Sequence, residues 1–149
     1  MEINPFRVAE KVAVDAGYQY EKVSDQVWRF LFTGRHLTEI DVVTVWQGQL
    51  FVLGAVITTQ PLALTQPDQA ARMIEEILIL NDRLDYVKVG INREQRIVVR
   101  ADLSTRTLDA QELRQLIEQV AASADFVYGA IKSFLTEKAA VDLGAEQAA

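Results

Sequence analysis

The sequence contains no cysteine and only one histidine, His36. Without cysteine the chain has no disulfide, no thiolate metal site and no thiol nucleophile. His36 lies between Arg35 and Leu37 in an expected turn, where a solvated or backbone-capping imidazole is the ordinary role. A general base would need a positioned partner and a pocket, and neither is evident in the neighbouring sequence. These absences argue against an enzyme.

Motifs for metals and nucleotides are also missing. The spacing of Asp and Glu residues matches neither an EF-hand loop nor an HExxH helix. The glycines are isolated, so no GxGxxG or GxxxxGK[ST] loop is present to hold phosphates. We therefore expect no bound metal and no cofactor.

Basic residues are in the minority, because 15 Lys and Arg face 21 Asp and Glu, a formal net charge of -6. They form no basic stripe, so neither nucleic acid nor an anionic lipid surface is an expected partner. The longest apolar run spans residues 50–57, whereas a membrane-spanning helix needs about 20 residues. The chain begins without a basic, then apolar, leader pattern. We expect a cytoplasmic protein that does not insert into membranes.

Half of the residues are apolar, which is enough for one core in a chain of this length. Residues 1–138 are expected to form a single α+β domain, and 139–149 to form a flexible acidic tail. Periodicity predicts helices at about 5–16, 68–84 and 109–138. Three or four antiparallel strands are expected between Tyr18 and Thr59, and two more after the second helix. The predicted order is α-β-β-β(-β)-α-β-β-α, with a sheet of five to six strands.

Large aromatic side chains are concentrated in the predicted strands. Trp28, Phe30 and Phe32 alternate along one strand and Trp46 ends the next. They either form the core or line an open sheet face that contacts a partner. The strand of residues 50–57, which includes Val52, does not alternate with polar residues. Both of its faces should be covered, by the rest of the domain or by a partner.

Two apolar residues lie outside the core-facing stripes of their helices. The stripe of the second helix contains Met73, Ile74, Ile77, Leu78 and Leu80, but Ile79 falls among charged residues on the opposite side. In the third helix Phe126 points away from the stripe that runs from Leu113 to Leu135. Ile79 and Phe126 are therefore candidate contacts to a client protein or to a second copy of the chain.

Several segments in the second half resemble a known family. They are Leu80-Asn81, the hairpin of residues 86–91 and 96–103, and the helical segment 108–125, which ends in the pair Ala124-Asp125. This pattern is similar to the type III secretion chaperone-like fold, which includes the Tir chaperones and YbjN-like proteins. The resemblance implies a homodimeric, cytoplasmic, non-catalytic chaperone. It also implies that the protein holds a segment of a client on apolar patches and strand edges.

Two other functions agree with the same residues. A curved sheet under a long helix can enclose a small apolar ligand, in a cavity lined by residues such as Trp28, Phe30, Val87 and Leu116. The chain could instead be a structural or assembly subunit of a larger complex. The leading hypothesis remains a chaperone or adaptor that binds a protein segment.

Overall fold

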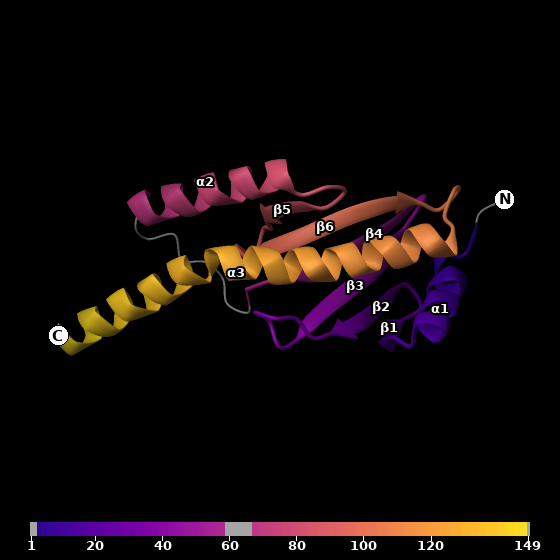
Figure 1. Ribbon diagram of the computed structural model, residues 1–149, viewed down its shortest axis with the longest axis horizontal. Helices are drawn as coiled ribbons and strands as arrows, with labels where there is room; N and C mark the ends of the chain where they lie inside the picture. Colours follow the sequence, from indigo (N-terminus) through magenta and orange to yellow (C-terminus); the bar gives the residue numbers. More distant parts are fainter. Residues whose placement is uncertain (1–2, 59–66, 149) are drawn as a thin grey trace.

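A computed structural model of the chain describes residues 3–58 and 67–148, with side chains described up to Leu135. The chain folds as an α+β domain, as predicted (Figure 1). The elements are α1 (Pro5–Ala16), β1 (Gln19–Ser24), β2 (Val27–Phe32), β3 (Ile40–Gln47), β4 (Leu50–Val56), α2 (Pro67–Arg83), β5 (Lys88–Ile91), β6 (Ile97–Ser104) and α3 (Ala110–Ala148).

The six strands form one antiparallel sheet in the order β1-β2-β3-β4-β6-β5. Where the sequence predicts three or four strands after Tyr18, the structure has four, and the first of them, β1, pairs with β2 so that Tyr20 opposes Phe30. Gly48 closes the β3–β4 hairpin with a φ of 57°, which glycine adopts without strain. Strands β1 and β5 are the two edges of the sheet.

The helices begin as the sequence predicts. The side chain of Asn4 accepts a hydrogen bond from the backbone N–H of Phe6 at 3.0 Å, and Gly17 ends α1 with a left-handed φ of 71°. Asp109 accepts from the backbone N–H of Glu112 at 2.8 Å and caps α3. Helix α3 runs to Ala148, past the end expected near Lys138. The flexibility of the segment 139–149 stays a prediction.

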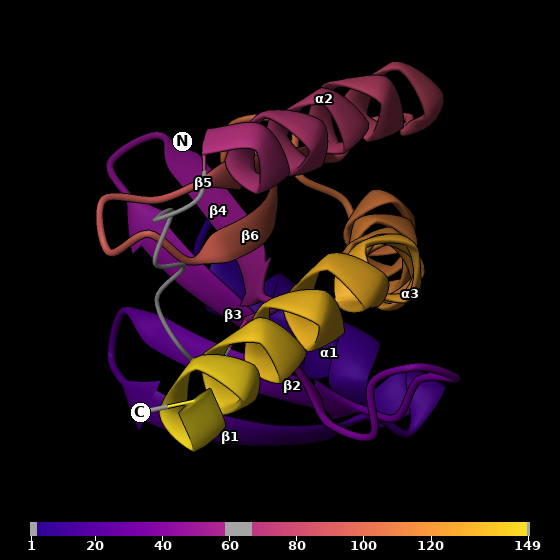
Figure 2. The same cartoon turned by 90° about the vertical axis from the view of Figure 1, so that its left-hand side faces the viewer.

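The core lies between the sheet and helices α1 and α3 (Figure 2). Phe6 of α1 stacks on Trp28 with ring centroids 4.9 Å apart and meets Phe51 edge-on at 5.3 Å. Helix α3 contacts β3, β4 and β6 through a buried stripe that includes Ile117 and Val127. One face of the sheet, which we call the inner face, is thus covered by helices.

Helix α2 lies beside strand β5 and helix α3 and buries a narrower stripe than the sequence predicts. Met73, Ile77 and Leu80 are buried, whereas Ile74 and Leu78 are 41% and 65% exposed. The prediction that Ile74 and Leu78 face the core was wrong, because α2 packs mainly on strand β5 and helix α3, and the residues that it buries are Met73, Ile77 and Leu80.

Candidate functional site

The second face of the sheet, here called the outer face, carries the side chains that alternate with the core residues of each strand. Along β2, β3 and β4 the core positions are buried, while Val27, Val45 and Val52 are only half-buried. Within the described residues, the helix contacts lie on the inner face and beside β5. The outer face therefore presents its side chains to solvent.

A row of three valines, one each from β2, β3 and β4, lies on this face. Val27 lies opposite Val45, and Val45 lies opposite Val52, so the three residues are neighbours on adjacent strands. Leu50 and Val56, at the two ends of β4, are 43% and 50% exposed. This valine row and its neighbours form an apolar surface where a partner side chain can be buried.

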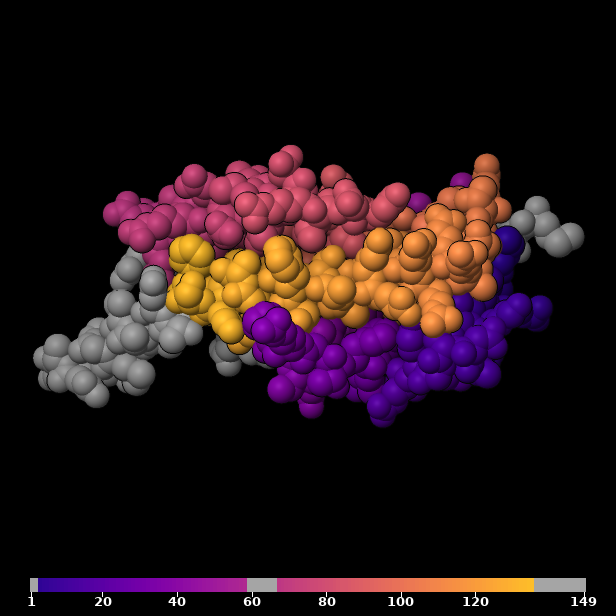
Figure 3. Space-filling view, in the orientation of Figure 1, coloured from indigo at the N-terminus to yellow at the C-terminus, as the bar shows by residue number. Residues whose placement is uncertain are grey.

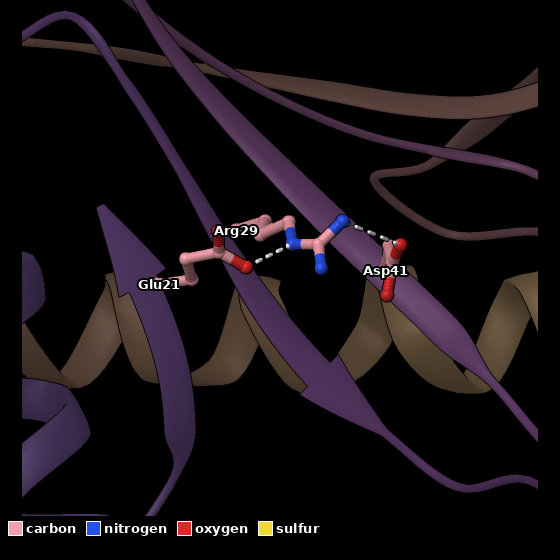
Figure 4. Close-up of polar contacts among 3 residues, drawn as sticks. All are labelled: Glu21, Arg29 and Asp41. Carbon is pink, nitrogen blue, oxygen red and sulfur yellow. Dashed lines mark hydrogen bonds and ion pairs between the residues drawn. The ribbon is translucent and has the colours of Figure 1, made fainter. Parts of the chain in front are cut away.

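A charged group borders the valine row on the side of β1 (Figure 4). The Nε of Arg29 donates to Glu21 Oε2 at 2.8 Å, and its Nη1 lies 3.4 Å from Asp41 Oδ2. Arg29 therefore joins β1, β2 and β3 across the outer face. These side chains are well exposed, so each ion pair contributes little to stability. Their effect is to give this corner of the sheet a polar rim.

The two edges of the sheet differ in their access to a further strand. At the β5 edge, the side chain of Asn81 donates to the carbonyl of Val89 at 2.8 Å and accepts from its N–H at 2.7 Å. Because α2 satisfies these outward backbone groups, the β5 edge is blocked at Val89. In the described part of the chain nothing pairs with the outer side of β1, and its residues are mostly exposed.

The loop between β2 and β3 is fastened to α3 by one carboxylate. Asp125 accepts backbone N–H bonds from Arg35 at 3.0 Å, His36 at 2.7 Å and Leu37 at 2.8 Å. The fit is close, because a Cβ at Gly34 would lie 2.3 Å from Asp125 Oδ1. Figure 3 shows this loop, in purple, against α3. The clamp fixes where β2 ends and β3 begins.

The hydrogen bonds at Asp125 decide its charge state. Burial acts to raise the pKa of Asp125, but the N–H groups of Leu37, His36 and Arg35 outweigh it and hold the pKa below the ordinary value. The carboxylate therefore remains ionised at neutral pH. On the same side of α3, the hydroxyl of Tyr18 donates to Glu118. Burial and that contact raise the pKa of Tyr18 to about 12.

The seven side chains singled out from the sequence occupy three kinds of position. Trp28 and Phe30 are 5% and 0% exposed and belong to the core, with Phe32 and Trp46 partly buried against it. Val52 lies on the outer face. Phe126 and Ile79 are 49% and 42% exposed, on α3 and α2 respectively. Val52, Phe126 and Ile79 thus lie on three different elements, and each retains solvent-accessible surface.

The sequence suggested a pocket for a small apolar ligand beside Trp28 and Phe30, but side chains fill the space around these two residues. Trp28 and Phe30 pack against Phe6, Tyr18 and Tyr20. Two clefts among the described residues are open to solvent and are lined mostly by polar residues.

Sequence reasoning missed two side chains that organise this surface, Asn81 and Asp125. Both belong to the segments on which the family resemblance rests, but their partners are far away or on another element. Each lies in a stretch of the sequence that mixes polar and apolar residues, so the local pattern did not indicate which groups its side chain binds. His36, expected to be solvated or capping, is exposed and lies 3.3 Å from Lys132 Nζ through its Nδ1.

The described residues contain neither a metal-binding cluster nor a helix suited to a membrane. No group of three or more His, Asp or Glu side chains there is arranged to hold a metal ion. Among the same residues, no helix combines the length and the apolar character that crossing a membrane requires.

The helix-covered inner face, the half-buried valine row and the open β1 edge define a small α+β domain with one uncovered sheet face. A family model described as "T3SS (YopN, CesT) and YbjN peptide-binding chaperone 1", TY-Chap1, matches residues 56–135, more than half of the chain. The chain belongs to this family of peptide-binding chaperones. The resemblance inferred from the sequence is thereby confirmed.

Two solved complexes contain chains with a similar fold. One is the HopA1-SchA chaperone-effector complex, with a TM-score of 0.54 and 9% identity over 84% of this chain and 91% of that chain. The other is the heterodimeric ExoU-SpcU complex from the type III secretion system of Pseudomonas aeruginosa, with a TM-score of 0.51 and 16% identity over 74% and 87%. Such low identities show the fold alone. No curated protein sequence matches this chain.

Proposed function

We propose that this protein is a non-catalytic cytoplasmic chaperone that holds an extended segment of a client protein, and that it works as a homodimer. Membership of a peptide-binding family supports the first part, as do the chaperone-effector complexes among its structural neighbours. The structural observation that carries the proposal is the outer face, where a valine row lies beside an unpaired edge strand.

The two features suit an extended polypeptide in complementary ways. Backbone N–H and C=O groups at the edge of a sheet can pair with an added strand, independently of the client's sequence. Apolar side chains of the client can then be buried on the valine row, which supplies selectivity. Because Asn81 blocks β5 at Val89, strand addition is assigned to β1.

The homodimer is assigned to apolar residues of α2 that the protomer leaves exposed. Ile79 is 42% exposed, Leu78 is 65% exposed and Ile74 is 41% exposed. Burial of several such side chains against a second copy would stabilise a dimer by about 1.5 to 3 kcal/mol per fully buried residue. Light scattering should give twice 16.7 kDa, and Ile79→Glu should weaken the dimer without unfolding the protomer.

The client site is tested with a substitution on the valine row. A client segment is first identified by affinity capture from the native host at mild salt, with crosslink mapping, and is then synthesised as a peptide. Val52→Lys should weaken its binding about tenfold, because the apolar contact is replaced by a charge. Val14→Lys is the matched control, since Val14 is 68% exposed on α1, away from the outer face.

Two results would contradict the proposal. One is peptide affinity that is equal in the wild type and in Val52→Lys, with both variants folded. The other is backbone amide protection by the peptide that maps to α1 or α2 and leaves β1 unchanged.

A further inference from the structure

A recess lies at the edge of β6, lined by residues of the α2–β5 connection, of strand β6 and of the first turns of α3. Figure 1 shows these three elements near one another. The recess is an open cleft of about 350 Å³. Leu103 and Leu116 provide its apolar lining, and the remaining wall is made by Tyr86 and by four carboxyl or amide side chains. No described contact or comparison above assigns it a role.

Tyr86 is the most exposed large apolar residue among those described, at 81%. Its φ is 66°, a left-handed conformation that a bulky side chain rarely adopts. Its ring lines the cleft and has no contact with another aromatic ring in the described residues, so most of its surface is available to a ligand. An electron-rich aromatic face of this kind attracts a cation.

Three of the four carboxyl and amide side chains in the polar wall of the cleft lack a partner among the described residues. Within the described structure the side chains of Glu112, Gln115 and Gln119 make no hydrogen bond or ion pair. Asp102 is already paired, because Arg100 Nε lies 3.3 Å from its Oδ1 in an exposed contact. The cleft therefore offers one free carboxylate and two amide oxygens beside the Tyr86 ring.

We propose that this cleft binds the guanidinium group of an arginine side chain, carried by the client polypeptide. A guanidinium has five N–H donors in one plane, so it can pair with Glu112 and the amide oxygens while it stacks on Tyr86. Leu103 and Leu116 contact the methylene stem of that arginine. A lysine ammonium has fewer donors and no planar face to stack, which makes it the poorer ligand.

The assignment of the arginine to the client rests on the proposed function, but the binding of a guanidinium can be tested without any client. The probe is Nα-acetyl-arginine amide, titrated into the full-length chain and followed by two-dimensional amide NMR. Nα-acetyl-citrulline amide is the control ligand, since it has the same shape without the charge. The arginine probe should give saturable shifts at residues 86, 112, 115 and 119, and citrulline should give none.

Substitutions separate the contributions of the ring and the carboxylate. Glu112→Gln should weaken arginine binding about fivefold or more, because a charge-assisted pair is lost. Tyr86→Phe should retain binding, whereas Tyr86→Gly should lose it. Glycine also relieves the left-handed φ, so Tyr86→Gly should stay folded, and its melting temperature is measured beside its binding. Glu75→Gln is the charge-matched control on the exposed side of α2, outside the cleft.

Three outcomes would overturn the proposal: equal shifts with citrulline, shifts spread evenly over acidic residues, or unchanged binding in Glu112→Gln. Each of them leaves the client site on the outer face intact, since Val52→Lys tests that site separately. Conversely, the client peptide could bind Val52→Lys as tightly as wild type while the arginine probe shifts only residues of the cleft. That result would contradict the proposed client surface and support the guanidinium site.

Discussion

Replacing Asp125 by alanine should loosen the β2–β3 loop from α3. The change removes the acceptor for three backbone N–H groups, and hydrogen bonds to a charged group contribute about 1.5 to 3 kcal/mol each when they are buried. Arg35 and His36 are exposed, so water replaces the carboxylate at their N–H groups. The N–H of half-buried Leu37 is left without an acceptor, and this accounts for most of the expected decrease of about 2 kcal/mol in the free energy of unfolding.

The assay is thermal unfolding followed by circular dichroism. For a chain of this size about 2 to 4 °C is lost per kcal/mol, so the melting temperature of Asp125→Ala should fall by about 4 to 8 °C. Amide exchange should quicken at residues 35–37 and stay unchanged in β4. The matched control is Asp102→Ala, which removes an exposed ion pair and should cost less than about 0.5 kcal/mol.

The pH dependence of stability tests independently whether ionised Asp125 stabilises the fold. The folded-state pKa of Asp125 lies below the ordinary value of 3.8, so the carboxylate stabilises the fold above that value. This contribution is lost as the pH falls through the folded pKa. The difference in stability between wild type and Asp125→Ala should thus be full at pH 7 and shrink below about pH 4. A melting temperature for Asp125→Ala within 1 °C of wild type at pH 7, measured to about that precision, would refute the clamp.

Three further changes have definite expected results. Gly34→Ala should lower the melting temperature, because its new Cβ would lie 2.3 Å from Asp125 Oδ1; an unchanged value would mean that the loop is not closely fitted to α3. Asn81→Leu should cost about 1 to 3 kcal/mol and speed amide exchange at Val89, whose two edge hydrogen bonds are lost; slow exchange would contradict the blocked edge. Phe126→Ser should leave the melting temperature within a few degrees while it weakens client binding or dimerisation about tenfold, and unfolding would show that this half-exposed ring is structural.

The fold was predictable because its signals are local. Asn4 and Gly17 mark the ends of α1 through a side-chain cap and a left-handed φ that depend only on neighbouring residues. Alternation along β2 placed Trp28 and Phe30 on one side and Val27 on the other, which is the arrangement observed. Such patterns need no knowledge of what lies across the core.

The surface was less predictable because it depends on contacts between distant elements. Periodicity gave α2 an apolar stripe, but only packing against β5 and α3 decides that Met73 is buried and Leu78 is not. Asp125 and Asn81 are polar residues within helices, and their function is set by backbone groups that the local sequence does not identify. Val52 was selected because its strand does not alternate between apolar and polar residues. This pattern indicates that both faces of the strand are covered, but it does not identify what covers the outer face.

The pairing of Asn81 with Val89 also limits how copies of this protein can join through their sheets. Open-ended fibres form when each molecule has two complementary free edges, so that every copy that is added presents a new template. Here the edge at β5 is occupied at its centre by a side chain of the same molecule. Pairing through the remaining edge, β1, therefore joins two copies and leaves no free edge for a third. A protein with one blocked edge can keep its other edge open for strand addition at high concentration without polymerising through its sheet.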